Sequence, residues 1–200
     1  MKLRIVGLGD STTAGTPGFL SPLEAPPDGE GNPESQYAYW MMLKHPDWTV
    51  LNRGINGQRT DEILARFDRD VIQENANWVI ILGGVNDVYQ GVDLTIIQEN
   101  LASLYQRSIS AGTRSVACTI LPYNTASKAE CGSIRDLNRF IENEAKRLGL
   151  AFCDTNRAVS DPNNPDRLRG SPDGYHPDVL GYQSMGYALT QVIQDYTLPS

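Results

Sequence analysis

Apolar residues along the chain fall into two kinds of run. In the first kind they are consecutive, which predicts strands buried on both faces, as in the middle of a parallel sheet. In the second kind they recur every three or four residues, which predicts amphipathic helices. The consecutive runs cover residues 4–8, 48–52, 78–82, 114–121 and 150–153. The spaced runs cover residues 36–43, 60–71, 94–110, 133–148 and 179–196, with Thr60 as the cap of the second one.

The order of these runs predicts the fold class. Strands and helices alternate five times, which is typical of a doubly wound parallel sheet with right-handed crossovers. We therefore expect an α/β protein of flavodoxin-like type, with a five-stranded parallel sheet between two helix layers in a three-layer α/β/α arrangement. A chain of 200 residues can bury one sizeable core, so we expect a single domain over residues 1–200.

One segment, residues 16–35, interrupts the alternation with many prolines and glycines. It predicts a long irregular loop inserted soon after the first strand. Loops of this length inside a compact domain are often functional, so we interpret it as a lid or pocket wall. A surface excursion without a role is the alternative.

Composition and charge exclude several classes of protein. A hydrophobic content of 40% and a charged content of 20% are those of an ordinary globular domain. The net charge of −7 argues against nucleic-acid binding, which needs clustered lysines and arginines to neutralise phosphates. No apolar run is long enough to span a membrane. No cleavable leader is visible ahead of the first strand, so we expect a cytoplasmic protein.

The cysteines indicate neither a disulfide framework nor a zinc site. Cys118, Cys131 and Cys153 contain no Cys-x-x-Cys pair. Cys118 and Cys153 fall in predicted strands and are expected to be small buried hydrophobic residues. No cluster of metal-ligating residues is visible, and we expect neither a metal nor an organic cofactor.

Chemistry-bearing residues follow the first three predicted strands. Strand 4–8 stops at Gly9-Asp10-Ser11, which places a hydroxyl at the carboxyl edge of the sheet, where open α/β sheets bind ligands. Gly54 and Gly57 follow the second strand and can turn backbone N–H groups toward that edge. Asn86 follows the third strand, and its amide suits a developing oxyanion. Each of these stretches, taken alone, also fits an ordinary turn or helix cap.

The fourth stretch is Asp173-Gly-Tyr-His176, just before the last predicted helix. His176 is one of two histidines, and the other, His45, lies at a predicted helix end where a positive charge complements the helix dipole. A histidine base would therefore be His176. Asp173 can fold back to hold one ring nitrogen while the other faces a hydroxyl.

Together these stretches fill every role that a nucleophilic serine requires. A serine needs a base, a group that orients the base, and donors for the tetrahedral oxyanion. The blocks resemble those of the SGNH (GDSL) hydrolase family, in the family's order and over nearly the whole chain. They are Gly9-Asp10-Ser11, the Gly57 turn, Gly84-Val85-Asn86-Asp87 and Asp173-Gly-Tyr-His176. No Gly-x-Ser-x-Gly elbow is present, so the chain does not resemble the usual α/β-hydrolases.

The resemblance implies a role for each matched residue. Ser11 would be the nucleophile, His176 the general base and Asp173 the residue that orients it. The oxyanion hole would consist of the Ser11 and Gly57 backbone N–H groups and the Asn86 side chain, with Gly54 as the alternative to Gly57. Asp10 would hydrogen-bond within the turn. Thr12 departs from the leucine of the family name, at a position without a catalytic role.

The function implied is that of a serine esterase acting on small-molecule carboxylic esters, with small acyl groups favoured. A carbohydrate O-deacetylase of the same family is one alternative. Aromatic residues that could line an acyl groove or a sugar platform, or belong to the core, are Phe19, Tyr37, Tyr39 and Trp40. The other alternative is a non-catalytic flavodoxin-like module in which residues 7–13 hold a phosphate or nucleotide at a helix N-terminus.

Overall fold

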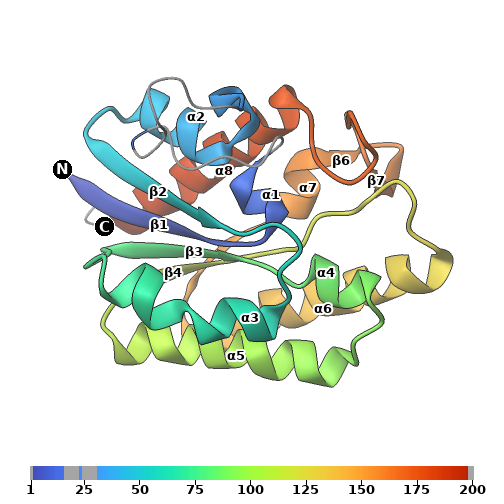
Figure 1. Cartoon of the computed structure of the whole chain (residues 1–200), viewed down its shortest axis with the longest axis horizontal. Coiled ribbons are helices and arrows are strands. Elements are labelled where there is room, and N and C mark those ends of the chain that lie inside the picture. Colours follow the sequence, from blue (N-terminus) through green and yellow to red (C-terminus); the bar gives the residue numbers. More distant parts are fainter. Residues whose placement is uncertain (1, 16–22, 24–30, 198–200) are drawn as a thin grey trace.

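A computed structural model describes residues 2–15, 23 and 31–197 of the chain (Figure 1). Its centre is a five-stranded parallel sheet in the order β2-β1-β3-β4-β5. The strands are β1 (Leu3–Gly9), β2 (Trp48–Gly54), β3 (Trp78–Leu82), β4 (Arg114–Cys118) and β5 (Ala151–Cys153). The expected five-stranded parallel α/β fold is thus confirmed.

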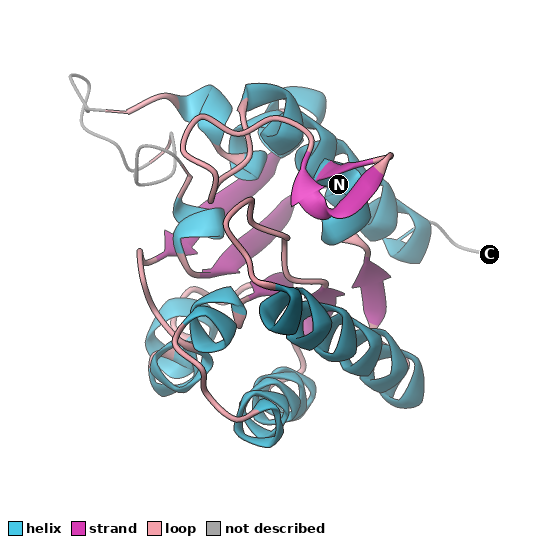
Figure 2. Cartoon of the chain, turned by 90° about the vertical axis from the view of Figure 1, so that its right-hand side faces the viewer, coloured by secondary structure: helices cyan, strands magenta, loops and turns pink. Residues whose placement is uncertain are grey.

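Helices cover both faces of the sheet because successive strand side chains point to opposite sides. Ile5 and Ile80 pack against α2 and α8, whereas Val6 and Ile81 pack against α3, α5 and α6. Figure 2, which faces the carboxyl edge of the sheet, shows the two helix layers on either side of it. The bounds are α2 (Tyr37–Lys44), α8 (Val179–Thr197), α3 (Thr60–Ala65), α5 (Leu94–Ser110) and α6 (Lys128–Leu148).

The strand order reverses at β1, which lies between β2 and β3. Such a switch point opens a crevice beyond the carboxyl ends of the strands. Gly9, the last residue of β1, pairs with Gly54 on one side and with Leu82 on the other. The segments that leave these three strands therefore start at the same level of the sheet.

Several elements differ from the expectation at their ends. The predicted strand 114–121 ends at Cys118, because the Ile120 backbone bonds the side chain of Asn138 on α6 instead of a strand. Helix α6 starts at Lys128, earlier than its apolar periodicity indicated, because Ser127 and Glu130 form a capping box.

The predicted helix 60–71 is in fact divided. Its α-helical part, α3, ends at Ala65, and a π-helical stretch, η2 (Asp68–Ile72), follows. The prediction that Thr60 caps this helix was wrong. The cap position is Arg59, and Thr60 is the first helical residue. The Thr60 hydroxyl donates to Asp87 and therefore does not cap the helix.

Five short elements among the described residues were not expected from the periodicity. They are α1 (Ser11–Ala14), α4 (Val85–Tyr89), α7 (Thr155–Val159) and the antiparallel pair β6 (Ser160–Asp161) and β7 (Asn164–Leu168). Each is too short for a hydrophobic period to be read. Cys118 and Cys153 are buried and free, as expected.

Most of the predicted loop 16–35 lies outside the described residues. The interpretation of this loop as a lid therefore stays a prediction. Its last residues form a single 3-10 turn, η1 (Pro33–Ser35), which Asn32 caps. Within the ranges that the structure describes, no helix is long and apolar enough to cross a membrane.

Candidate active site

Ser11, His176 and Asp173 form a continuous hydrogen-bonded chain at the carboxyl edge of the sheet. His176 Nε2 lies 2.9 Å from Ser11 Oγ, and His176 Nδ1 lies 2.6 Å from Asp173 Oδ2. A carboxylate on Nδ1 holds the proton on that nitrogen and leaves the Nε2 lone pair facing the hydroxyl. The geometry is that of a serine with a base within reach of its proton.

Ser11 is held by a turn that depends on Gly9 and Asp10, the two residues before it. Asp10 Oδ1 accepts hydrogen bonds from the N–H and the hydroxyl of Thr12, at 2.9 and 2.7 Å. This caps α1, whose first residue is Ser11. A Cβ on Gly9 would lie 2.2 Å from Leu82 O and 2.3 Å from Thr13 Oγ1, so only glycine fits there. The turn is thereby packed directly against β3.

Asp10 supports the turn, and in the described part of the chain its carboxylate makes no hydrogen bond to the histidine ring. Burial raises the pKa of Asp10 to about 6, and the hydrogen bonds from Thr12 oppose that rise. Among the described residues its Oδ2 atom has no hydrogen-bond partner. The carboxylate bonded to the His176 ring is Asp173, the residue to which the resemblance assigns the orienting role.

The Asp173 carboxylate is fixed by its own loop. Its Oδ1 accepts the backbone N–H groups of Tyr175 and His176, both at 2.8 Å. Partial burial would raise the pKa of Asp173, but the hydrogen bonds from the His176 ring and from these two N–H groups outweigh it and hold the pKa at about 2. Asp173 is therefore ionised wherever an imidazole can act as a base.

Two backbone N–H groups at this edge remain available for a ligand. In the part of the chain that the structure describes, neither the Ser11 nor the Gly57 N–H donates a hydrogen bond. Gly57 adopts φ +77°, where glycine is favoured. The Gly54 N–H, by contrast, donates to Asn52 Oδ1 at 2.9 Å. A Cβ on Gly54 would lie 2.1 Å from Ala14 N, so packing explains that glycine, and the geometry favours Gly57 as the donor.

Asn86 lies beside these donors, in the first turn of α4. Its Nδ2 donates one hydrogen bond to Gln58 O at 3.0 Å, which leaves the second amide hydrogen for a ligand. The neighbouring Asp87 is buried and accepts from the N–H and hydroxyl of Thr60, at 3.0 and 2.6 Å. This pair ties α4 to the start of α3, so the Asn86 and Gly57 segments are held together.

These groups surround a pocket of about 350 Å³. Besides Ser11, Gly57, Asn86 and His176, three tyrosine rings line it: Tyr89, Tyr123 and Tyr175. Tyr123 and Tyr175 stack at 6.0 Å, and Tyr89 meets both rings edge to face at 5.9 and 6.2 Å. We call these three residues the tyrosine wall.

The tyrosine wall was missed by the sequence interpretation, which considered other aromatic residues. Of those, Tyr37 is fully buried, Trp40 packs against the core beside α8, and Phe19 lies outside the described residues. The wall combines residues from α4, from the connection after β4 and from the loop of His176. Tyr175 lies within the fourth motif block, which was the one available signal.

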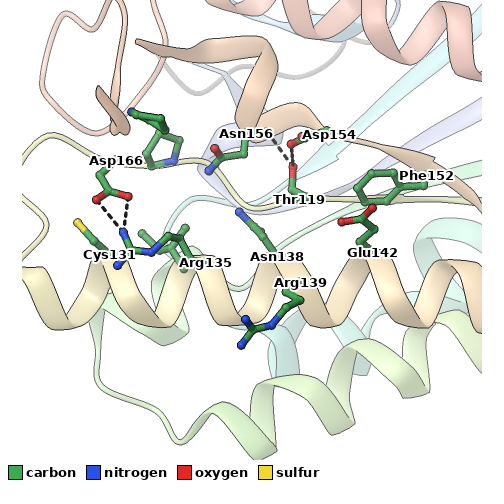
Figure 3. Close-up of a pocket in the computed structure, with 13 residues that line it drawn as sticks. Thr119, Cys131, Arg135, Asn138, Arg139, Glu142, Phe152, Asp154, Asn156 and Asp166 are labelled. Carbon is green, nitrogen blue, oxygen red and sulfur yellow. Dashed lines mark hydrogen bonds and ion pairs between the residues drawn. The ribbon is translucent and has the colours of Figure 1, made fainter. Parts of the chain in front are cut away.

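A second hollow, of about 370 Å³, lies between α6 and the carboxyl ends of β4 and β5 (Figure 3). Two pairs of its polar side chains bond each other. Arg135 points to Asp166 at 2.6 Å, and Thr119 donates to Asp154 at 2.9 Å. It contains neither Ser11 nor His176, both of which line the tyrosine-walled pocket.

Comparisons with known proteins bear on the family and the fold of the chain. The GDSL-like lipase/acylhydrolase family model matches residues 8–184. An acetylxylan esterase from Geobacillus stearothermophilus is 26% identical over 158 residues, which cover 72% of this chain and 71% of the relative.

Two solved structures share the fold. One is from a Desulfitobacterium hafniense protein described as belonging to the G-D-S-L lipolytic family, with TM-score 0.79, 24% identity, and coverage of 96% of this chain and 99% of the other. The other is the Geobacillus stearothermophilus acetylxylan esterase, with TM-score 0.72, 20% identity, and coverage of 96% and 94%.

Proposed function

The chain belongs to the GDSL-like lipase/acylhydrolase family, and from this premise we propose that it is a serine esterase that cleaves carboxylic esters of small acyl groups. The observation that carries the proposal is the short contact between His176 Nε2 and Ser11 Oγ, with Asp173 on the opposite ring nitrogen. A hydroxyl, a base and an orienting carboxylate in this order are what acyl transfer requires.

The reaction would proceed in two steps. Ser11 Oγ attacks the ester carbonyl carbon while its proton moves to His176 Nε2, and Asp173 stabilises the imidazolium. The carbonyl oxygen becomes an oxyanion that accepts hydrogen bonds from Ser11 N, Gly57 N and Asn86 Nδ2. His176 then returns the proton to the departing alcohol. A water molecule, deprotonated by His176, attacks the acyl-enzyme and releases the carboxylic acid and Ser11.

The competing phosphate-binding module is poorly supported by the same residues. A phosphate cradle needs a helix N-terminus free of negative charge. Here α1 has only four residues, and the Asp10 carboxylate already accepts the Thr12 N–H at its start.

The size of the pocket favours short acyl chains. Its volume of about 350 Å³ is near the lower end of small-molecule sites, which run from roughly 300 to 1,000 Å³. We expect kcat/KM for p-nitrophenyl esters to fall at least about tenfold from acetate to octanoate, a difference of about 1.4 kcal/mol. Rates are measured against Ser11→Ala as the background. A kcat/KM that holds or rises with chain length would contradict the preference for small acyl groups.

A second candidate function is removal of O-acetyl groups from a carbohydrate. The specific observation is the tyrosine wall, since the C–H face of a sugar ring is apolar and packs well on an aromatic ring. The acetylxylan esterase relative is named for a substrate of this kind. The wall would then bind the sugar on the alcohol side of the ester while Ser11 receives the acetyl group.

Tyr89→Ala is expected to separate the two functions, because Tyr89 lines the pocket and 57% of the residue is exposed and open to a ligand. If the alcohol part is a sugar, KM for an O-acetylated xylo-oligosaccharide should rise about tenfold, the size of one aromatic contact. KM for ethyl acetate, which has no ring, should stay within about twofold. Tyr187→Ala on α8, at an exposed tyrosine outside the pocket, is the matched control. An unchanged KM for the oligosaccharide would argue against the deacetylase.

A further inference from the structure

A buried arginine lies beneath the site and takes no part in the reaction as described. Arg66 follows the last residue of α3, and only 7% of it is exposed. Its planar guanidinium offers five N–H donors in a fixed fork. Four donate: to Gly9 O at 2.7 Å, Arg53 O at 2.8 Å, Gln58 Oε1 at 2.6 Å and Asp70 Oδ2 at 2.6 Å.

Asp70 is the carboxylate that forms an ion pair with this arginine, at 2.6 Å. A buried guanidinium needs a partner charge, and the carboxylate of Asp70 is also buried. Asp70 lies within η2, the π-helical stretch, and π-helical turns occur mostly as short insertions, frequently at functional sites. Arg69, which is largely exposed, also bonds Asp70 but none of the other three partners of Arg66.

The three remaining acceptors lie next to the donors of the oxyanion hole. Gly9 O is two residues before Ser11, at the end of β1. Gln58 follows Gly57 directly, and its own carbonyl accepts the hydrogen bond from Asn86. Arg53 O is at the end of β2, from which the Gly57 segment leaves. One rigid group therefore bonds the segments of Ser11 and Gly57 directly and is linked to Asn86 through Gln58.

We propose that Arg66 is a positioning residue, which holds the Ser11 N–H, the Gly57 N–H and the Asn86 amide at fixed separations. This inference rests on the proposed ester hydrolysis. Donors that are already in place when charge develops on the carbonyl oxygen need no rearrangement in the transition state. A displacement of about 1 Å at such a site can cost about a hundredfold in rate.

Three variants test the proposal in the full-length protein. Arg66→Met removes all four bonds, Arg66→Lys keeps the positive charge for Asp70 but not the fork, and Arg69→Met is the matched control. We expect kcat for p-nitrophenyl acetate to fall about 10- to 100-fold in both Arg66 variants, with KM within about twofold. Arg69→Met should leave kcat unchanged. Wild-type kcat in Arg66→Lys would overturn the proposal, because the charge alone would then suffice.

Amide hydrogen exchange measures how firmly the segments around Ser11 and Gly57 are held, independently of activity. Arg66→Met should speed exchange in segments 9–15 and 54–60 at least about tenfold, and Arg69→Met should not. Unchanged exchange in both segments would overturn the inference even if the protein hydrolysed no ester, whereas an inactive wild type with the expected exchange would contradict only the proposed function. Should Arg66→Met fail to fold, Gln58→Leu removes only the Nε contact. It should lower kcat severalfold, and a wild-type kcat there would also overturn the proposal.

Discussion

Replacing Ser11 by alanine is expected to lower kcat for ester hydrolysis by about 10⁵-fold, and replacing His176 by alanine should cost about as much. Without Ser11 Oγ no acyl-enzyme can form, and without His176 nothing accepts the proton of the hydroxyl that lies 2.9 Å away. Because the two residues act in one step, the double variant should be no slower than either single variant. Steady-state kinetics of each variant give kcat, and thermal unfolding shows whether the variant is folded.

Controls for this prediction come from the chain itself. His45, the other histidine, does not line the pocket; its ring stacks on that of Trp48, with the ring centroids 4.3 Å apart. The His45→Ala variant should therefore keep the wild-type kcat at temperatures where the variant is folded. Ser184→Ala removes an exposed hydroxyl on α8 in the same way. Folded Ser11→Ala or His176→Ala protein with a wild-type rate would show that the pair does not carry the reaction.

Asn86→Ala is expected to lower kcat by about 10²- to 10³-fold with little change in KM, since its amide would bond the oxyanion and not the ground-state ester. Asn86→Asp should be slower still, because a carboxylate repels a developing negative charge. Asn156→Ala, in the second hollow, also loses an amide bond to a backbone carbonyl and is the control. A fall in kcat in the control as large as that in Asn86→Ala would remove the oxyanion explanation.

The fold could be predicted where burial acts on whole runs of sequence. The strand at residues 78–82 and the helix at residues 94–110 have the bounds that their apolar patterns predicted. Patterns fail where a few side chains set the structure. Helix 60–71 is divided where Arg66 pairs with Asp70. The helix propensities of the nearby residues do not predict that pair.

The candidate site was predictable for a related reason. Parallel strands end at one edge of the sheet, so residues that follow β1, β2 and β3 had to meet there. The tyrosine wall and Arg66 were not predictable in this way. Tyr123 follows β4 and joins the other two rings only through tertiary packing. In the sequence, Arg66 looks like any arginine near the end of a helix. Its role becomes visible only in the structure, where it bonds Gly9 and Gln58.

The contact between Ser11 and His176 joins residues that are 165 positions apart in the chain. During translation, at about 5–20 residues per second, Ser11 precedes His176 by roughly ten to thirty seconds. Under the proposed mechanism, Ser11 lacks its base throughout that interval and is not yet activated as a nucleophile. If the proposed mechanism holds, activity arises only after His176 has been made and packed against Ser11, so the order of synthesis delays it to the end of folding.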